Sequence, residues 1–112
     1  MKVKEVKERL DLKLVAGENG LEKEIKDVYV CDLLSWVMAH AHKDSAWVTI
    51  QTHPNVIAVA ALLELSCVII PEDTEIDEIT IKKADEESLP ILVSKENGYN
   101  ICCKLYDLMK GK

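Results

Sequence analysis

The sequence predicts an α/β fold with a small, mainly parallel central sheet flanked by helices. Three observations carry this prediction: a mostly apolar run at residues 46–51, an almost wholly apolar segment at 54–65 and a short continuous apolar run at 67–70. Strands that are buried on both faces have continuous apolar runs, and a helix between two of them forms a βαβ unit. The polar turns that follow the two strands should therefore lie side by side.

The other elements follow from periodicity and from turn residues. Val3, Val6 and Leu10 fall at i, i+3 and i+7, which indicates an amphipathic helix. Asp32 is placed to cap a short helix, and Thr74 with Asp77 forms a capping-box pattern. The expected order around the βαβ unit is a helix at 3–10, a strand at 12–16, a turn at 17–20, a strand at 25–31, a helix at 33–38, a helix from about 74 to 87, a strand at 90–93 and a helix at 101–109.

The segment at 54–65 has no polar face along its Val-Ile-Ala-Val-Ala-Ala-Leu-Leu run. A helix that is apolar all round is buried on more than one side, either by the sheet and neighbouring helices or by a partner subunit. We therefore expect a homo-oligomer, most simply a dimer.

Composition limits the classes of function. The chain has 112 residues, close to the length of one domain, so we expect residues 1–112 to form a single domain. Its formal net charge is −6, and Arg9 is the only arginine. This charge would repel a nucleic-acid backbone, and the scarcity of arginine removes the usual bidentate clamp for phosphate groups. We therefore expect no nucleic-acid partner.

The sequence also predicts a cytoplasmic protein with no membrane partner. No segment reaches about 18 to 20 apolar residues, and residues 1–9 lack the apolar core of a signal peptide. The cysteines Cys31, Cys67, Cys102 and Cys103 show no C-x-x-C spacing. Three of them fall in apolar segments, so we expect reduced core thiols in place of disulfides.

Several segments resemble the DRTGG domain family, which is related to the N-terminal domain of bacterial HPr kinase/phosphorylase. They are Lys2-Val-Lys-Glu-Val6, Leu14-Val-Ala-Gly-Glu-Asn-Gly-Leu21, Val28-Tyr-Val-Cys-Asp-Leu-Leu-Ser35 and Pro90-Ile-Leu-Val93. The resemblance implies the same fold. Domains of this kind are found alone, or fused to phosphotransacetylase and to CBS-domain pyrophosphatases, so it implies a regulatory or binding module more than an enzyme.

The two signature turns of this family have other residues here. Where the family pattern has Asp-Arg-Thr before the buried helix, this sequence has Thr52-His-Pro54, and where it has Gly-Gly after the next strand, this sequence has Glu72 and Asp73. His53 replaces a permanent cation with an imidazole, which is ordinarily neutral at pH 7. The two acids add bulk and negative charge, so an anionic ligand of relatives is disfavoured here.

The resemblance does not extend to kinase chemistry. The kinase relatives carry their chemistry in a C-terminal domain with a P-loop, and no G-x-x-x-x-G-K-[ST] pattern occurs in this sequence. No nucleophile and base stand at an interpretable spacing, and no metal triad is visible. We therefore expect no enzymatic activity and no cofactor.

The pair of turns after residues 46–51 and 67–70 is the strongest candidate for a binding site. Open α/β sheets bind ligands at the carboxyl ends of their strands, and the helix that starts near Pro54 offers free N–H groups there. The alternative is that Thr52 or His53 simply caps this helix. The predicted ligand-binding residues are Gln51, Thr52, His53, Asn55, Pro71, Glu72 and Asp73.

A metal site is a weaker candidate. His40, His42 and His53 could combine with Cys31 or with acidic residues, since imidazole and thiolate are the usual zinc ligands. Their spacing matches no recognised ligand pattern, and solvated loop histidines are the simpler interpretation. We expect no metal.

The adjacent cysteines and the two tryptophans also have structural interpretations. Neighbouring residues of a helix point about 100° apart and a vicinal disulfide is strained, which argues against a redox pair at Cys102 and Cys103. Trp36 and Trp47 could stack a base or a flavin, yet both lie in apolar runs typical of a core or an interface. Trp36 and Met38 are the predicted interface residues.

The sequence thus favours a non-catalytic regulatory or sensory module that binds a small molecule, with a nucleotide as one candidate. The alternative is an accessory protein that works only through protein contacts. Stand-alone relatives, as the resemblance implies, lie beside redox enzymes such as iron hydrogenases. An acidic surface with exposed Trp36 and Met38 would suit that role.

Overall fold

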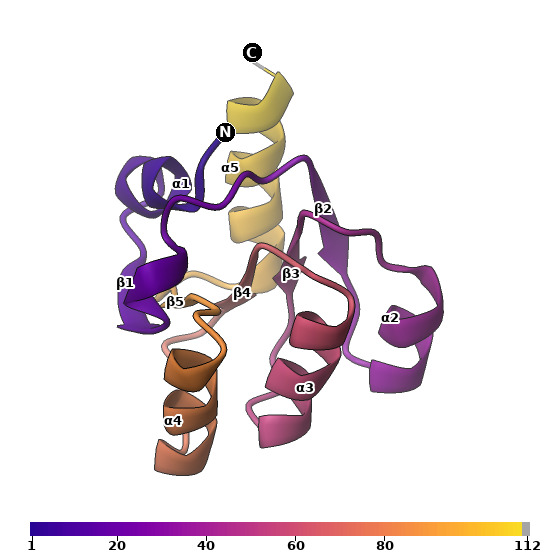
Figure 1. The fold of residues 1–112 in the computed structure, drawn as a ribbon. Helices are drawn as coiled ribbons and strands as arrows, with labels where there is room; N and C mark the ends of the chain where they lie inside the picture. Colours follow the sequence, from indigo (N-terminus) through magenta and orange to yellow (C-terminus); the bar gives the residue numbers. More distant parts are fainter. Residues whose placement is uncertain (111–112) are drawn as a thin grey trace.

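The computed structural model describes residues 1–110, which form a mixed α/β structure (Figure 1). Its elements are α1 (Val3–Arg9), β1 (Lys13–Ala16), a short 3₁₀ helix η1 (Glu18–Gly20), β2 (Asp27–Val30), α2 (Leu34–His40), β3 (Ser45–Val48), α3 (Pro54–Leu62), β4 (Cys67–Ile70), α4 (Glu78–Glu86), β5 (Ile91–Val93) and α5 (Gly98–Lys110). The predicted α/β class is confirmed. Within residues 1–110, none of the helices combines the length and the apolar character that crossing a membrane requires.

The five strands form one sheet in the order β1-β5-β4-β3-β2. The pairs β2–β3, β3–β4 and β4–β5 are parallel, whereas β1 pairs with β5 in the antiparallel sense. The sheet is therefore mixed but mostly parallel. The predicted βαβ unit is present, with β3 and β4 as hydrogen-bonded neighbours joined through α3.

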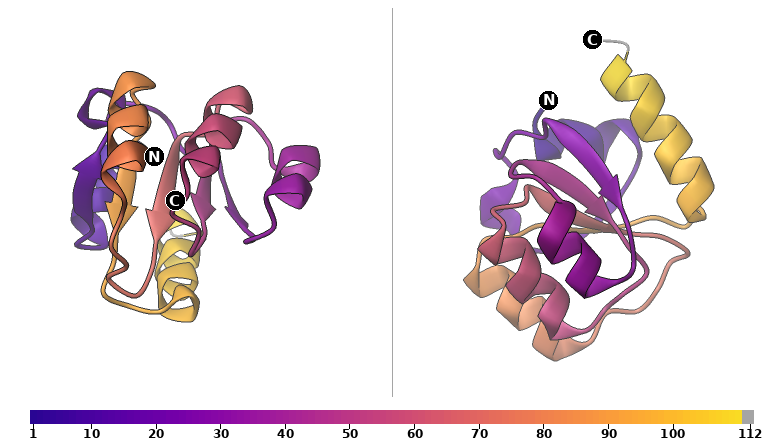
Figure 2. Two further views of the ribbon diagram at one scale, coloured as in Figure 1. Left: turned by 90° about the horizontal axis from the view of Figure 1, so that it is seen from below. Right: turned by 90° about the vertical axis from the view of Figure 1, so that its right-hand side faces the viewer.

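Helices cover both faces of the sheet (Figure 2). One core packs α2, α3 and α4 against one face, through residues such as Val37, Ile57 and Ala84. The other core packs α1 and α5 against the opposite face, through residues such as Val6 and Leu105. The crossovers after β2, β3 and β4 thus share a face, while the helix after β5 lies on the other side.

Trp47 of β3 is a buried tryptophan whose hydrogen bond links β3 to the loop after β2. Its side chain is fully buried in the core that includes α3, and its indole Nε1–H donates to the Cys31 carbonyl oxygen at 2.8 Å. A buried indole needs a partner for its N–H, and here the partner lies in the loop after β2. The same contact holds that loop close to the end of β3.

Two predicted caps are wrong. Asp32 does not cap α2, whose N-cap is Leu33 with no side-chain hydrogen bond. Helix α4 begins at Glu78 and not near residue 74, because the Thr74 hydroxyl donates to the Pro71 carbonyl oxygen at 2.7 Å and forms a local turn. In both cases the polar side chain forms its hydrogen bonds outside the helix that it was predicted to cap.

Helix α3 is only partly buried within the single chain, so the sheet and the neighbouring helices do not cover it on all sides. Val56, Ile57, Val59 and Ala60 are buried, whereas the side chain of Leu62 is 69% exposed. The single chain therefore covers one face of α3 and leaves the other in solvent. Strand β4 spans the predicted residues 67–70, and β1 and β5 each begin one residue later than predicted. Strand β3 ends at Val48 and not at residue 51, and α5 begins at Gly98 and not at residue 101.

Candidate functional site

The predicted turns lie at the carboxyl ends of two neighbouring parallel strands, as expected. Strand β3 ends at Val48 and β4 ends at Ile70, and the Thr49 N–H donates to the Ile69 carbonyl oxygen at 3.1 Å. This bond continues the pairing of the strands by one step. The segments 49–55 and 71–73 therefore both start from the same edge of the sheet.

Asp32 organises the first turn, a role that sequence analysis missed. Its Oδ1 accepts from the Thr49 hydroxyl at 2.7 Å and from the Ile50 N–H at 3.0 Å. Its backbone carbonyl accepts from the Gln51 side-chain amide at 3.1 Å. One residue from the loop after β2 thus fixes three consecutive residues after β3, and a carboxylate becomes part of this edge.

His53 is the N-cap of α3, which decides between the two caps that the sequence left open. Its Nδ1 accepts from the Asn55 N–H at 3.1 Å, and its carbonyl accepts from the Val56 N–H. The Thr52 carbonyl accepts from the Thr80 hydroxyl of α4 at 2.7 Å. His53 is exposed, so its ring contributes a cap through one nitrogen while the rest of the ring faces solvent.

These bonds limit what the first turn can bind. Pro54 has no N–H, and the N–H groups of Asn55 and Val56 already have partners within the chain, so the start of α3 is a poor phosphate cradle. The Asp32 carboxylate nearby also disfavours an anion. What remains exposed is the side-chain polar groups of Gln51, His53 and Asn55, next to the side chain of Ile50, which is 43% exposed.

The second turn has an unusual backbone at the two positions where the family pattern has Gly-Gly. Glu72 and Asp73 have φ of 65° and 50°, in the left-handed region that glycine adopts most easily. Their N–H groups donate to the carbonyl oxygens of Glu96 at 2.9 Å and Ser94 at 2.7 Å. Glu72 and Asp73 therefore adopt the left-handed backbone conformation although neither is a glycine, and both carboxylates are exposed at this edge.

The topology places a switch point one strand away from the predicted pair of turns. The chain leaves β4 for α4 on one face and leaves β5 for α5 on the other, so the connections diverge between β4 and β5. Ligands of open α/β sheets commonly bind at such a point. A pocket of about 300 Å³ lies beside this point, lined by Asp73, by residues 93–96 and, from the α1–β1 segment and α5, by Leu10, Asp11, Lys13 and Lys104. Asp73 is the predicted site residue that lines this pocket, and residues 94–96 were missed.

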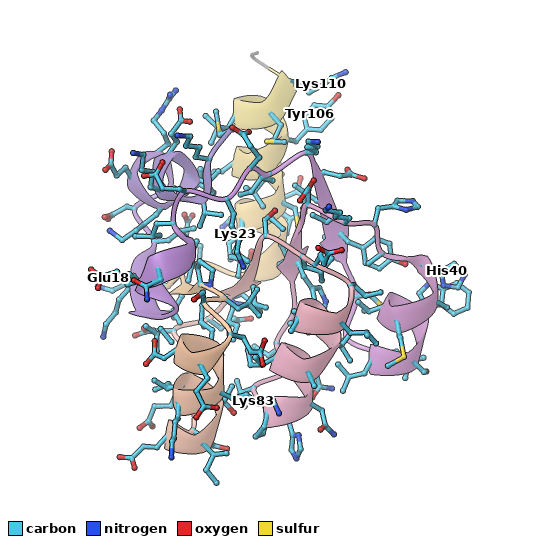
Figure 3. All side chains as sticks on the ribbon, viewed as in Figure 1. Glu18, Lys23, His40, Lys83, Tyr106 and Lys110 are labelled. Atoms are coloured by element: carbon cyan, nitrogen blue, oxygen red, sulfur yellow. The ribbon has the colours of Figure 1, made fainter. Side chains whose placement is uncertain are left out.

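Apart from His53 in the first turn and Cys31 directly after β2, the histidines and cysteines lie away from this edge. His40 stacks on Trp36 with ring centroids 4.0 Å apart, and its Nδ1–H donates to the Trp36 carbonyl oxygen at 2.9 Å. Figure 3 shows His40 at the outer surface of α2. Among residues 1–110, no group of three or more His, Cys, Asp and Glu side chains is arranged to hold a metal ion.

The cysteines are free thiols in different environments. Cys67 is fully buried, and burial raises the pKa of its thiol to about 12. Cys102 is half-buried, and burial raises the pKa of its thiol as well, whereas Cys103 is exposed. These environments are consistent with the structural interpretation of the adjacent pair.

Four large apolar side chains are exposed on β2, on α2 and in the loop between them. We use the name α2 patch for these residues, Val30, Leu33, Trp36 and Met38, whose side chains are 47–61% exposed. Strand β2 is an edge strand of the sheet, so its outer side has no neighbouring strand. The predicted interface residues Trp36 and Met38 therefore lie on a surface that a partner can reach.

The fold and this edge together define the class of protein. It is a small α/β domain with polar turns at the carboxyl ends of its strands, and the Asp32 side chain holds the first of these turns in place. The chain belongs to the DRTGG domain family, whose model matches residues 5–107. The family resemblance of the sequence is thereby confirmed. No curated protein matches the sequence significantly.

A solved structure shows the same fold. It is the crystal structure of the CBS and DRTGG domains of the regulatory region of Clostridium perfringens pyrophosphatase, complexed with the activator diadenosine tetraphosphate. The two structures match with a TM-score of 0.74 and 10% sequence identity, over 93% of this chain and 45% of that chain. This chain thus spans less than half of the length of that regulatory region.

Proposed function

We propose that this chain is a non-catalytic regulatory or sensory module that acts in the cytoplasm and binds a small ligand at the carboxyl edge of its sheet. We assign residues 1–112 to one domain of this kind. The proposed contacts are the residues predicted from the sequence: Gln51, Thr52, His53, Asn55, Pro71, Glu72 and Asp73. The observation that carries the proposal is the turn held by Asp32, which presents exposed polar side chains from a fixed backbone.

The chemistry of this turn favours a nucleobase over a phosphate group. The side-chain amides of Gln51 and Asn55 can pair with the polar edge of a purine, and exposed Ile50 offers an apolar surface for the ring. The backbone N–H groups that would hold a phosphate are already bonded. A nucleotide is supported further by the ligand of the pyrophosphatase regulatory region, which is diadenosine tetraphosphate.

Thermal unfolding in the presence of candidate ligands tests this proposal. The panel contains adenosine, ATP, GTP, diadenosine tetraphosphate and inorganic phosphate. A ligand at 100 times its dissociation constant adds about 2.7 kcal/mol to stability, which is a rise in Tm on the order of 10 °C for a domain of this size. We expect adenosine and ATP to give similar shifts at equal concentrations, and phosphate to give none.

Variants locate the site. Gln51→Ala and Asn55→Ala should each abolish the shift, while Asn100→Ala, which changes an exposed amide on α5, should retain it. His53→Ala should lower the Tm of the free protein by removing the cap, and it should also abolish the shift. A flat panel with a well-folded protein would contradict the proposal.

A second function rests on the α2 patch. Exposed apolar side chains beside an unpaired edge strand are typical of a contact surface. We propose that this surface forms a homodimer or holds a protein partner such as a redox enzyme of the iron hydrogenase type. Sedimentation equilibrium tests the dimer: Trp36→Ser with Met38→Ser should yield monomers, whereas Ile79→Ser on the exposed side of α4 should not. An unchanged mass for the first variant would contradict this assignment of the interface.

A further inference from the structure

A second pocket lies at the opposite edge of the sheet, far from the proposed ligand turns. Its volume is about 250 Å³, and its walls come from the segments before β3 and β4 and from the ends of α3 and α4. This volume is below that of typical drug-sized sites, so the pocket suits a small metabolite.

Lys23 is the cation of this pocket. The side chain is half-buried, and burial lowers the pKa of its ammonium group from the ordinary value. Within residues 1–110, the structure gives this ammonium no hydrogen bond and no ion pair with a carboxylate. Figure 3 shows Lys23 at the upper ends of α3 and α4. A half-buried charge without a close partner is costly, so a carboxylate supplied by a ligand would be favoured here.

Glu87 is an exposed anion that lines the same pocket. It is the C-cap residue of α4, where the helix dipole and the last carbonyl groups already make the potential negative. Glu87 interacts electrostatically with Lys23, yet the two groups form no ion pair in the described part of the chain. A nearby cation therefore stabilises a carboxylate at this end of α4. The other helix that lines the pocket, α3, also has its carboxyl end at the pocket.

The other charges of the pocket are already paired. Lys43 lies 3.8 Å from Glu64, and Asp44 lies 3.5 Å from Lys26. The pocket therefore leaves one ammonium and one carboxylate for an occupant. Ser45, which is next to Asp44 and is bonded through its backbone to Ser66, has the single buried side-chain polar atom without a partner in residues 1–110.

We propose that this pocket binds a small zwitterion of the amino-acid type, whose carboxylate contacts Lys23 and whose ammonium contacts Glu87 and the carboxyl ends of α3 and α4. A simple anion would satisfy Lys23 but would face Glu87 and two negative helix ends. A simple cation would satisfy the helix ends but would face Lys23. The zwitterion is the class of ligand that both groups favour.

Thermal unfolding with the individual L-amino acids, with acetate and with ethylammonium tests this inference. We expect at least one amino acid to raise the Tm by on the order of 10 °C at 100 times its dissociation constant. Its methyl ester, which lacks the carboxylate, and its N-acetyl derivative, which lacks the ammonium, should both bind at least tenfold more weakly. Acetate and ethylammonium should give no shift at the same concentration.

Substitutions assign the shift to this pocket. Lys23→Met and Glu87→Gln should each weaken binding at least tenfold. The matched controls Lys82→Met and Glu86→Gln change exposed charges on α4 that do not line the pocket, and they should leave the affinity unchanged. The Tm of each free variant reports whether it is folded. The inference would be overturned by no shift with any amino acid, by ester and N-acetyl forms that bind as tightly as the free amino acid, or by binding that persists in both Lys23→Met and Glu87→Gln.

Discussion

Replacing Asp32 by alanine should destabilise the protein by about 2 kcal/mol. The Asp32 carboxylate accepts from the Thr49 hydroxyl at 2.7 Å and from the Ile50 N–H at 3.0 Å. Thr49 is only 2% exposed, so its hydroxyl would lose a charged partner with little access to water, which costs about 1–3 kcal/mol. The Ile50 N–H lies in an exposed turn where water can replace the carboxylate, so it adds little.

Urea unfolding at pH 7 measures this loss. A change of 2 kcal/mol lowers the urea midpoint by about 1 M when the slope is near 2 kcal/mol/M. Asp32→Asn keeps one acceptor oxygen and should lose less than the alanine variant. The control Asp107→Ala removes an exposed acid from α5 and should change stability by less than about 0.5 kcal/mol. A midpoint for Asp32→Ala within error of the wild type would refute the role of Asp32 in holding this turn.

Three further predictions concern the backbone and the buried thiol. Glycine at both Glu72 and Asp73 should raise the free energy of unfolding by about 1 kcal/mol, because φ of 65° and 50° suits glycine; lower stability in urea would contradict this. Gly17→Ala should lower the free energy of unfolding by about 3 kcal/mol, since the new Cβ would lie 2.0 Å from the Leu89 carbonyl oxygen. Gly98→Ala should be nearly neutral, because a Cβ there would meet no other atom within 4 Å. Equal urea midpoints of the two variants would refute this contrast. Burial raises the pKa of Cys67 to about 12, above the value near 8.5 of an unfolded thiol. The unfolded chain therefore loses this proton first, and the free energy of unfolding should fall as the pH rises from about 8.5 toward 12. Cys67→Ala should flatten this alkaline loss of stability in unfolding curves measured across that range.

Hydrophobic patterning predicted the central part of the fold because burial dictates it. The run Cys67-Val-Ile-Ile70 is apolar at every position, and all four residues are buried in a strand between two others. The same logic placed Pro54 in the first turn of α3, where its missing N–H is harmless. These segments carry their structural signal within a few residues, so no tertiary information was needed.

Polar contacts between distant segments could not be predicted in this way. Asp32 follows a strand and precedes a helix, which is a pattern typical of an N-cap, yet its partners lie 17 and 18 residues further along the chain. Thr74 has the spacing of a capping box, but its hydroxyl satisfies a carbonyl three residues back. The start of α5 at Gly98 did have a local signal, because the Asn97 side chain accepts from the Asn100 N–H at 2.9 Å.

The candidate site was predicted in outline only. The two turns lie on one edge because β3 and β4 are parallel neighbours, which the βαβ pattern required. The switch point between β4 and β5 depends on which face each later helix covers, and hydrophobic periodicity does not contain that information. Residues 94–96, which line the pocket with Asp73, were therefore missed.

Amide chemical-shift mapping by NMR locates any ligand site on the sheet. The ¹⁵N-labelled protein is titrated with adenosine and separately with diadenosine tetraphosphate, and the shifted backbone amides are assigned. We expect saturable shifts to cluster at Asp32, at residues 50–55 and at residues 71–73. Saturable shifts confined to another face, or no shifts at millimolar ligand from a folded protein, would contradict a ligand site at the carboxyl edge of the sheet.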